Sequence, residues 1–117
     1  MKELKLSLQM FTICDLFNEN PENALKVASD IGFKAVEFYS YRNVTDAEHL
    51  RQWLDKYGLT CSGINVNWSY FQPDTIDQTI SDCKILGTDR IAIGSAPAED
   101  LGKRSKMPEI FKVLKFA

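Results

Sequence analysis

A strand-like segment followed by a helix-like segment occurs four times along this chain. The predicted strands cover residues 4–11, 35–40, 60–67 and 90–96. Their even spacing of ~30 residues is typical of repeated βαβ units and predicts a parallel sheet. We expect residues 1–117 to form a single domain, because no linker or low-complexity tract divides the chain.

Helix start and stop signals separate the predicted strands. Asn20 and Pro21 predict the N-cap and the first position of one helix, and Gly32 predicts its end. Thr45 and Glu48 fit a capping box at the start of the next helix. The buried stripe of a third helix is predicted to contain Ile76, Ile80, Cys83 and Leu86. A last amphipathic segment would bury Ile110, Phe111 and Leu114.

The two faces of the predicted sheet differ in character. One face is apolar and consists of Leu6, Leu8, Val36, Phe38, Ile64, Val66, Ile91 and Ile93. The opposite face is small or polar and consists of Ser7, Gln9, Ala35, Glu37, Tyr39, Cys61, Gly63, Asn65, Asn67, Ala92 and Gly94. Right-handed crossovers place successive helices on one side of a sheet, so the apolar face should meet them.

The polar face then resembles the interior of a barrel. A complete (β/α)8 barrel typically needs ~250 residues, so 117 residues match about half of one. We therefore predict an α/β fold, a parallel (βα)4 half of a TIM barrel. An open flavodoxin-like sheet is the alternative, although neither a G-x-G-x-x-G nor a P-loop motif is present to bind a nucleotide.

Four segments in order resemble the xylose isomerase-like barrel superfamily, which includes sugar phosphate isomerases and epimerases and the family 2 apurinic endonucleases. They are LSLQMF (6–11), IGFKAVEF (31–38), YGLTCSGI (57–64) and LGTDRIAIG (86–94). The resemblance covers residues 5–96 and corresponds to the amino-terminal half of such a barrel.

The resemblance implies a divalent metal (Mn, Mg or Zn) at the barrel mouth and proton transfer on a small sugar or sugar phosphate. The metal-binding acids and histidine of the sugar epimerases would lie beyond Ala117. Asn65 stands near the position where third-strand histidines occur in the family, and asparagine is a poor ligand for a transition metal. We therefore expect this chain alone to bind no metal and to be inactive.

Glu37 is the candidate catalytic residue, because a carboxylate on the inner face of a sheet needs a partner or a role. Its structural alternative is a fixed ion pair or hydrogen bond. The candidate sugar-binding residues are Gln9, Phe11, Tyr39, Asn65, Asn67 and Trp68. Amides can hydrogen-bond sugar hydroxyls and aromatic rings can stack on sugar faces, but both could equally serve packing within the protein.

Charge and composition narrow the choice of partners. The formal net charge is −2, which argues against nucleic acid, and no apolar run reaches the ~18 residues that cross a membrane. A cytoplasmic location is expected. Three cysteines without a C-x-x-C spacing predict reduced thiols, and the only histidine, His49, is expected on a helix surface.

The most favoured function is therefore a sugar phosphate isomerase/epimerase-like half-barrel. A non-catalytic binding or assembly module on the same scaffold is the alternative. Because a half-barrel would expose two strand edges and its inner face, we predict a homo-oligomer that closes the barrel.

Overall fold

A computed structural model of the chain describes residues 5–95. Its four strands form one sheet in the order β1-β2-β3-β4, and every neighbouring pair is parallel. The strands are β1 (Ser7–Gln9), β2 (Ala35–Phe38), β3 (Thr60–Asn67) and β4 (Ile91–Ser95). The predicted parallel α/β architecture is thereby confirmed.

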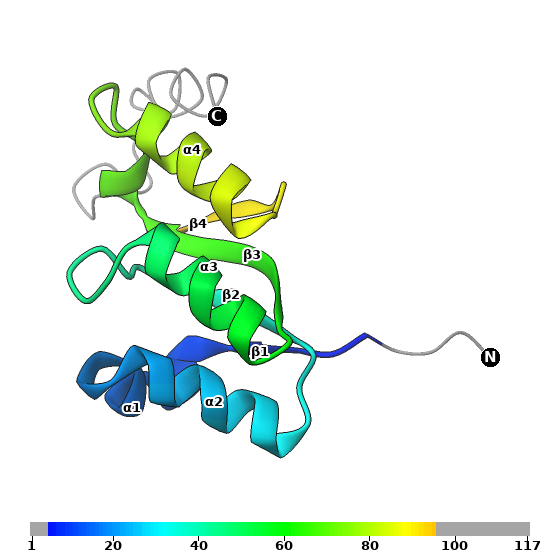
Figure 1. Ribbon diagram of the computed structural model, residues 1–117. Coiled ribbons are helices and arrows are strands. Elements are labelled where there is room, and N and C mark those ends of the chain that lie inside the picture. Colours follow the sequence, from blue (N-terminus) through cyan, green and yellow to red (C-terminus); the bar gives the residue numbers. More distant parts are fainter. Residues whose placement is uncertain (1–4, 96–117) are drawn as a thin grey trace.

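Helices follow each of the first three strands. They are α1 (Cys14–Glu19), α2 (Pro21–Ile31), α3 (Ala47–Lys56) and α4 (Ile76–Leu86), with 3-10 turns η1 (Met10–Ile13) and η2 (Trp68–Phe71). Figure 1 shows α2, α3 and α4 side by side on one side of the sheet. This is the arrangement that right-handed crossovers in one direction produce, and it leaves the other face without helices in the described residues.

The first strand is shorter than predicted. Residues 10 and 11 belong to η1, because the Gln9 side chain accepts a hydrogen bond from the Phe11 N–H and turns the backbone out of the sheet. Leu6 precedes the paired residues and is 69% exposed, so its assignment to the buried face was wrong. The segment between η1 and α2 contains a further helix, α1, which the sequence analysis did not predict.

Helix boundaries follow their predicted signals closely. Asn20 caps α2 by accepting from the Asn23 N–H, and Gly32 ends it in the left-handed conformation at φ 120°. The N-cap of α3 is Asp46, which accepts from the His49 N–H; the capping box expected at Thr45 is therefore wrong by one residue.

The core lies between the sheet and the helices. Val36, Phe38, Ile64 and Val66 face it and are at most 1% exposed. Cys61 also joins this core, which corrects its predicted place on the polar face. The cause is a bulge: Cys61 pairs with Val36, whereas Gly63 pairs with Glu37, and the extra residue between them shifts the alternation.

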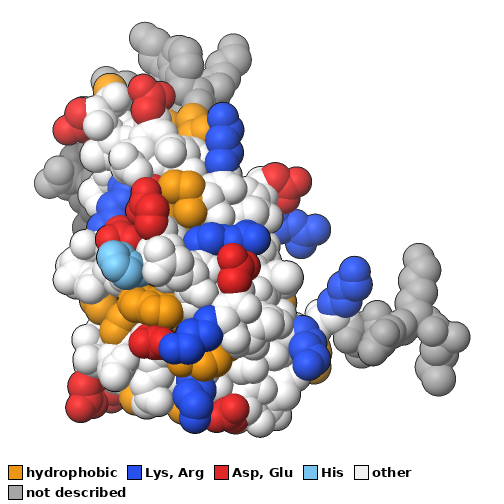
Figure 2. Space-filling view, in the orientation of Figure 1, with side chains coloured by type: hydrophobic (Ala, Val, Ile, Leu, Met, Phe, Trp, Pro, Cys, Tyr) orange, Lys and Arg blue, Asp and Glu red, His pale blue; other side chains and the backbone are white. Residues whose placement is uncertain are grey.

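The outer surface of the helices is mixed in charge. Figure 2 shows acidic and basic side chains interspersed over this face. Within residues 5–95, no helix has the length and apolar character needed to cross a membrane. The predicted strand ends at Leu4 and Ala96, and the amphipathic segment with Ile110, Phe111 and Leu114, lie outside the described residues.

Candidate functional site

Gln9 and Glu37 form a pair on the inner face, at the carboxyl half of β1 and β2. They stand in register on neighbouring parallel strands, and Gln9 Nε2 donates a hydrogen bond to Glu37 Oε1. The side-chain oxygen of Gln9, Oε1, accepts from the Phe11 N–H at 3.1 Å. The oxygen and the nitrogen of the Gln9 amide therefore each have a hydrogen-bond partner, and the NH2 group points toward the Glu37 carboxylate.

Two aromatic candidates lie beside this pair. The rings of Phe11 and Tyr39 meet edge to face with centroids 5.4 Å apart. Phe11 is 62% exposed, whereas Tyr39 packs partly against the core and donates its hydroxyl to Asn18 Oδ1 at 2.8 Å. Burial raises the pKa of Tyr39, so its hydroxyl stays a hydrogen-bond donor at neutral pH.

Asn65 lies on the inner side of β3, next to β4. Its Oδ1 atom is buried and is the one such side-chain atom in the described part of the chain that lacks a hydrogen-bond partner. A Cβ atom added at Gly94 would lie 2.7 Å from this oxygen, so the glycine makes room for the amide. Leaving a buried acceptor without a partner is costly, so Asn65 is an inner-face residue whose hydrogen-bonding capacity the described residues do not satisfy.

Asn67 and Trp68 stand where β3 ends. The Asn67 side chain accepts from the Ser69 N–H at 3.1 Å and also from the Ser69 hydroxyl, so it caps η2. Its backbone N–H donates a hydrogen bond to Ser40 Oγ at 3.1 Å. Trp68 begins η2 and is partly buried, and its carbonyl accepts from Gln72.

The candidate residues form two groups. Gln9, Phe11, Glu37 and Tyr39 contact one another at the ends of β1 and β2. Asn65, Asn67 and Trp68 line the carboxyl half of β3. Within residues 5–95, no hydrogen bond joins the two groups, although both occupy the carboxyl half of one sheet.

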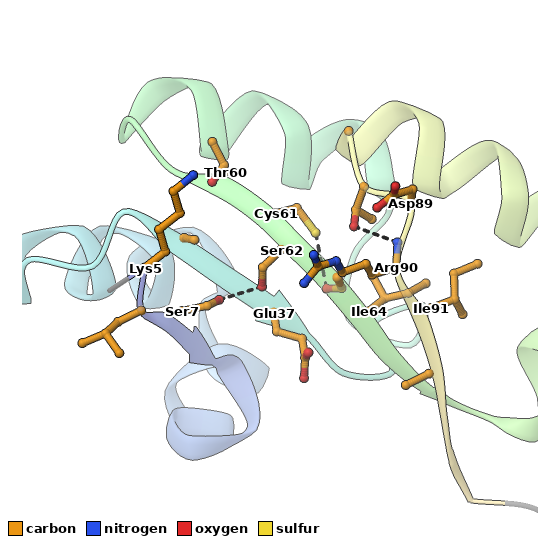
Figure 3. Close-up of a pocket in the computed structure, with 16 residues that line it drawn as sticks. Lys5, Ser7, Glu37, Thr60, Cys61, Ser62, Ile64, Asp89, Arg90 and Ile91 are labelled. Atoms are coloured by element: carbon orange, nitrogen blue, oxygen red, sulfur yellow. Dashed lines mark hydrogen bonds between the residues drawn. The ribbon is translucent and has the colours of Figure 1, made fainter. Parts of the chain in front are cut away.

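An open cavity of about 750 Å³ lies on the same inner face, nearer the strand starts. Figure 3 shows Ser7, Ser62 and Glu37 side by side in it, and the two serine hydroxyls are 2.7 Å apart. Active sites of TIM barrels lie at the opposite, carboxyl end of the strands. We therefore interpret this cavity as part of the barrel interior. Glu37 borders both this cavity and the candidate site at the carboxyl ends of the strands.

Sequence reasoning missed a buried cluster of polar side chains between the loop after β2 and helix α4. This polar cluster consists of Tyr41, Arg42, Tyr70, Thr79 and Asp82. Burial, with the hydrogen bond to Asp82 as a second cause, raises the pKa of Tyr41 far above its ordinary value. One signal was available: Thr79 lies three residues after Ile76 and four before Cys83, on the buried stripe of α4.

The cysteines and the histidine are the remaining reactive residues, and of these Cys61 borders the inner-face cavity (Figure 3). All three cysteines are free, and burial raises the pKa of Cys61 and of Cys83 to about 11, which keeps both thiols protonated. His49 lies exposed on α3, as predicted, with its Nδ1 atom 2.8 Å from Asp46 Oδ1. Neither feature provides a nucleophile at the candidate site.

The divalent metal implied by the resemblance finds no ligand set in the described part of the chain. Across residues 5–95, no three His, Cys, Asp or Glu side chains are grouped to hold a metal ion. Glu37 is the one carboxylate of the candidate site, and its neighbour is an amide. These residues do not fit a metal on their own.

Comparison with known proteins identifies the fold. No protein-family model matches the chain, and no curated protein matches its sequence significantly. Among solved structures, a family 2 AP endonuclease from Brucella melitensis superposes with a TM-score of 0.74 at 19% identity, over 97% of this chain and 49% of that one. A sugar phosphate isomerase/epimerase from Parabacteroides distasonis ATCC 8503 superposes with a TM-score of 0.65 at 14% identity.

The second match covers 99% of this chain and 46% of that chain. The chain thus spans about half the length of both structures, as expected for four units of an eight-unit barrel. At the level of fold, the predicted resemblance is confirmed: this chain is a (βα)4 half of a TIM barrel, similar to half of an AP endonuclease of family 2 and half of a sugar phosphate isomerase/epimerase.

Proposed function

We propose that this chain supplies half of a sugar phosphate isomerase/epimerase-like barrel, with Glu37 as its catalytic carboxylate. The observation that carries the proposal is the Gln9–Glu37 pair, which holds a carboxylate on the inner face at the carboxyl half of two neighbouring strands. The proposed sugar contacts are Gln9, Phe11, Tyr39, Asn65, Asn67 and Trp68.

The pair suits proton transfer. One route to both isomerisation and epimerisation of a sugar is removal of a proton from a carbon next to a carbonyl group, and a positioned carboxylate can accept that proton. Gln9 occupies Oε1 of Glu37, and within the described residues Oε2 takes no hydrogen bond. Oε2 is thus the atom proposed to take the proton, while the amide fixes the orientation of the carboxylate.

A small sugar is preferred to DNA as the substrate. The formal net charge of −2 gives the chain no excess of lysine and arginine to neutralise a phosphate backbone. Amide and aromatic side chains on the inner face are suited to hydroxyl groups and to the apolar face of a sugar ring. A location in the cytoplasm stays a prediction.

A second half must cover the inner face for the site to be complete. Among residues 5–95, β1 and β4 are the two edge strands of the sheet, and an edge strand presents unpaired backbone groups. We propose that a second copy of the chain closes the barrel, with β4 of each copy beside β1 of the other. Analytical ultracentrifugation tests this assembly: a well-folded monomer at micromolar concentration would contradict it.

The alternative function is a binding or assembly module without chemistry. It is favoured by the lack of a metal-ligand group among residues 5–95. A turnover assay on a panel of pentose and hexose phosphates, with Mn²⁺, Mg²⁺ or Zn²⁺ added in turn, separates the two. Sugar binding without turnover would favour the module.

The proposal is tested with Glu37→Gln in the closed assembly of two copies, because the single chain is expected to be inactive. Loss of a catalytic base should lower kcat by at least about 100-fold, whereas sugar affinity should change little because the glutamine keeps its shape and its bond to Gln9. Gln9→Ala serves as the companion variant, and a smaller loss is expected because the carboxylate remains. Equal turnover of Glu37→Gln and the unaltered chain would reject Glu37 as the base.

A further inference from the structure

Asp82 is a buried carboxylate whose two oxygens are both engaged. It lies on α4 with only 4% of its side chain exposed. Oδ2 accepts from the Tyr41 hydroxyl at 2.6 Å and from Arg42 Nη2 at 3.0 Å, and Oδ1 accepts from Gln78 at 2.7 Å. Leaving such a charge without partners would be costly, so these bonds hold the loop after β2 against α4.

Tyr70 ties the same loop to the segment after β3. Its hydroxyl oxygen accepts from the backbone N–H groups of Tyr41 and Arg42, at 2.8 and 2.9 Å. The Arg42 guanidinium lies over its ring, 4.1 Å from the centroid. The Tyr70 carbonyl in turn accepts from the Thr79 hydroxyl at 2.6 Å, so η2 is fixed to α4 as well.

The loop between β2 and α3 depends on these bonds because it has no regular structure of its own. Residues 41 and 42 lie outside every helix and strand, and their N–H groups take the Tyr70 hydroxyl as partner. The loop begins at Tyr39, and the segment it is tied to begins at Trp68. Both are candidate sugar contacts, one at the end of β2 and the other at the end of β3.

We propose that Tyr70, Asp82 and Arg42 are positioning residues that lock the loops after β2 and β3 to one another and so set the spacing of Tyr39 and Trp68 at the barrel mouth. The inference that this spacing serves a sugar rests on the proposed function. The locking itself does not, because it follows from the bonds between the loops and α4. None of the three residues needs to touch the sugar.

Hydrogen exchange measured by mass spectrometry tests the locking. Asp82→Asn and Tyr70→Phe should each speed exchange about tenfold in residues 40–46 and 68–72, while β3 exchanges as before. Asp55→Asn is the matched control, because Asp55 is an exposed helical aspartate paired with Arg51. Faster exchange throughout the chain, or no change in the two loops, would overturn the proposal.

Tyr70→Phe protects the test against failure to fold, since it removes one hydroxyl and keeps the ring. A second measurement uses fructose 6-phosphate and xylulose 5-phosphate as probes in titrations of the chain. Tyr70→Phe should weaken binding at least fivefold, and Asp55→Asn should not. Equal affinity despite faster loop exchange would overturn the positioning role. If the unaltered chain binds neither probe, the proposed function fails, while the exchange experiment still decides the locking.

Discussion

The two faces of the sheet are built for different purposes. On the helix-covered face, Val36, Phe38 and Ile64 are at most 1% exposed and pack into a continuous core. On the inner face, Glu37 and Asn65 are partly exposed, and the buried Oδ1 atom of Asn65 lacks a hydrogen-bond partner within the described residues. Burial of apolar side chains therefore stabilises the helix side, whereas the inner side carries the polar residues on which the proposed function depends.

Phe38→Ala should cause the largest loss of stability. Phe38 is fully buried and packs against Phe17 and Tyr41, so truncation removes apolar contact and leaves a cavity. The free energy of unfolding should fall by about 3–5 kcal/mol, measured by urea denaturation. Phe11→Ala, at an exposed aromatic near the inner face, is the control and should cost less than about 1 kcal/mol. Similar losses at both positions would contradict the conclusion that the helix-covered face contributes more to stability than the inner face.

The thiols of Cys61 and Cys83 should report the same burial through their chemistry. Burial raises both pKa values to about 11, so at pH 8 only roughly a thousandth of each is thiolate. Alkylation by iodoacetamide should be more than about 100-fold slower in the native chain than in urea, a ratio equal to about 2.7 kcal/mol. The native rate should keep rising up to about pH 11, whereas the rate in urea should level off near pH 9.

Mass spectrometry of the labelled peptides measures each cysteine separately. Cys14, which is only partly buried, provides the internal control and should react first. Rapid labelling under native conditions of Cys83, which lies on α4 away from the inner-face cavity, would show that the helix-covered face opens readily. The assignment of stability to that face would then be lost.

Much of the helix-covered face could be predicted from the sequence, because alternation along strands and stripes along helices follow directly from burial. The capping residues Asn20 and Gly32 could likewise be predicted, because Asn20 accepts a local hydrogen bond and Gly32 adopts a positive φ. The bulge that turns Cys61 toward the core could not be read, because it depends on the register between β2 and β3.

The inner face was predicted only in part. The sequence placed Gln9 and Glu37 on one side of the sheet, but their direct hydrogen bond required the register of β1 against β2. The polar cluster was missed for a similar reason. Arg42 and Asp82 are 40 residues apart, so their pairing depends on how a loop packs on a distant helix, which periodicity does not report.

Gly94→Ala tests a tightly packed point of the inner face. An added Cβ would lie 2.7 Å from Asn65 Oδ1, so the Asn65 side chain must rotate. Because only the end of a side chain has to move, the free energy of unfolding should fall by about 1 kcal/mol, measured by urea denaturation. Combining it with Asn65→Ala should remove most of the loss, and additive effects in this double-mutant cycle would contradict the contact.

Glu37→Gln should have the smallest effect on stability of all these changes, although it is the change expected to abolish turnover. The glutamine oxygen can still accept from Gln9 Nε2, and Glu37 is partly exposed, so neither a bond nor a core contact is lost. The free energy of unfolding should stay within about 0.5 kcal/mol of the unaltered value at pH 7.

Gln9→Glu is the contrasting variant, because it places two carboxylates side by side and should destabilise the chain progressively as the pH rises above about 5. If Glu37→Gln instead lowers the free energy of unfolding as much as a core truncation does, Glu37 contributes to stability. The inner face would then stabilise the fold at the very residue on which the proposed function depends.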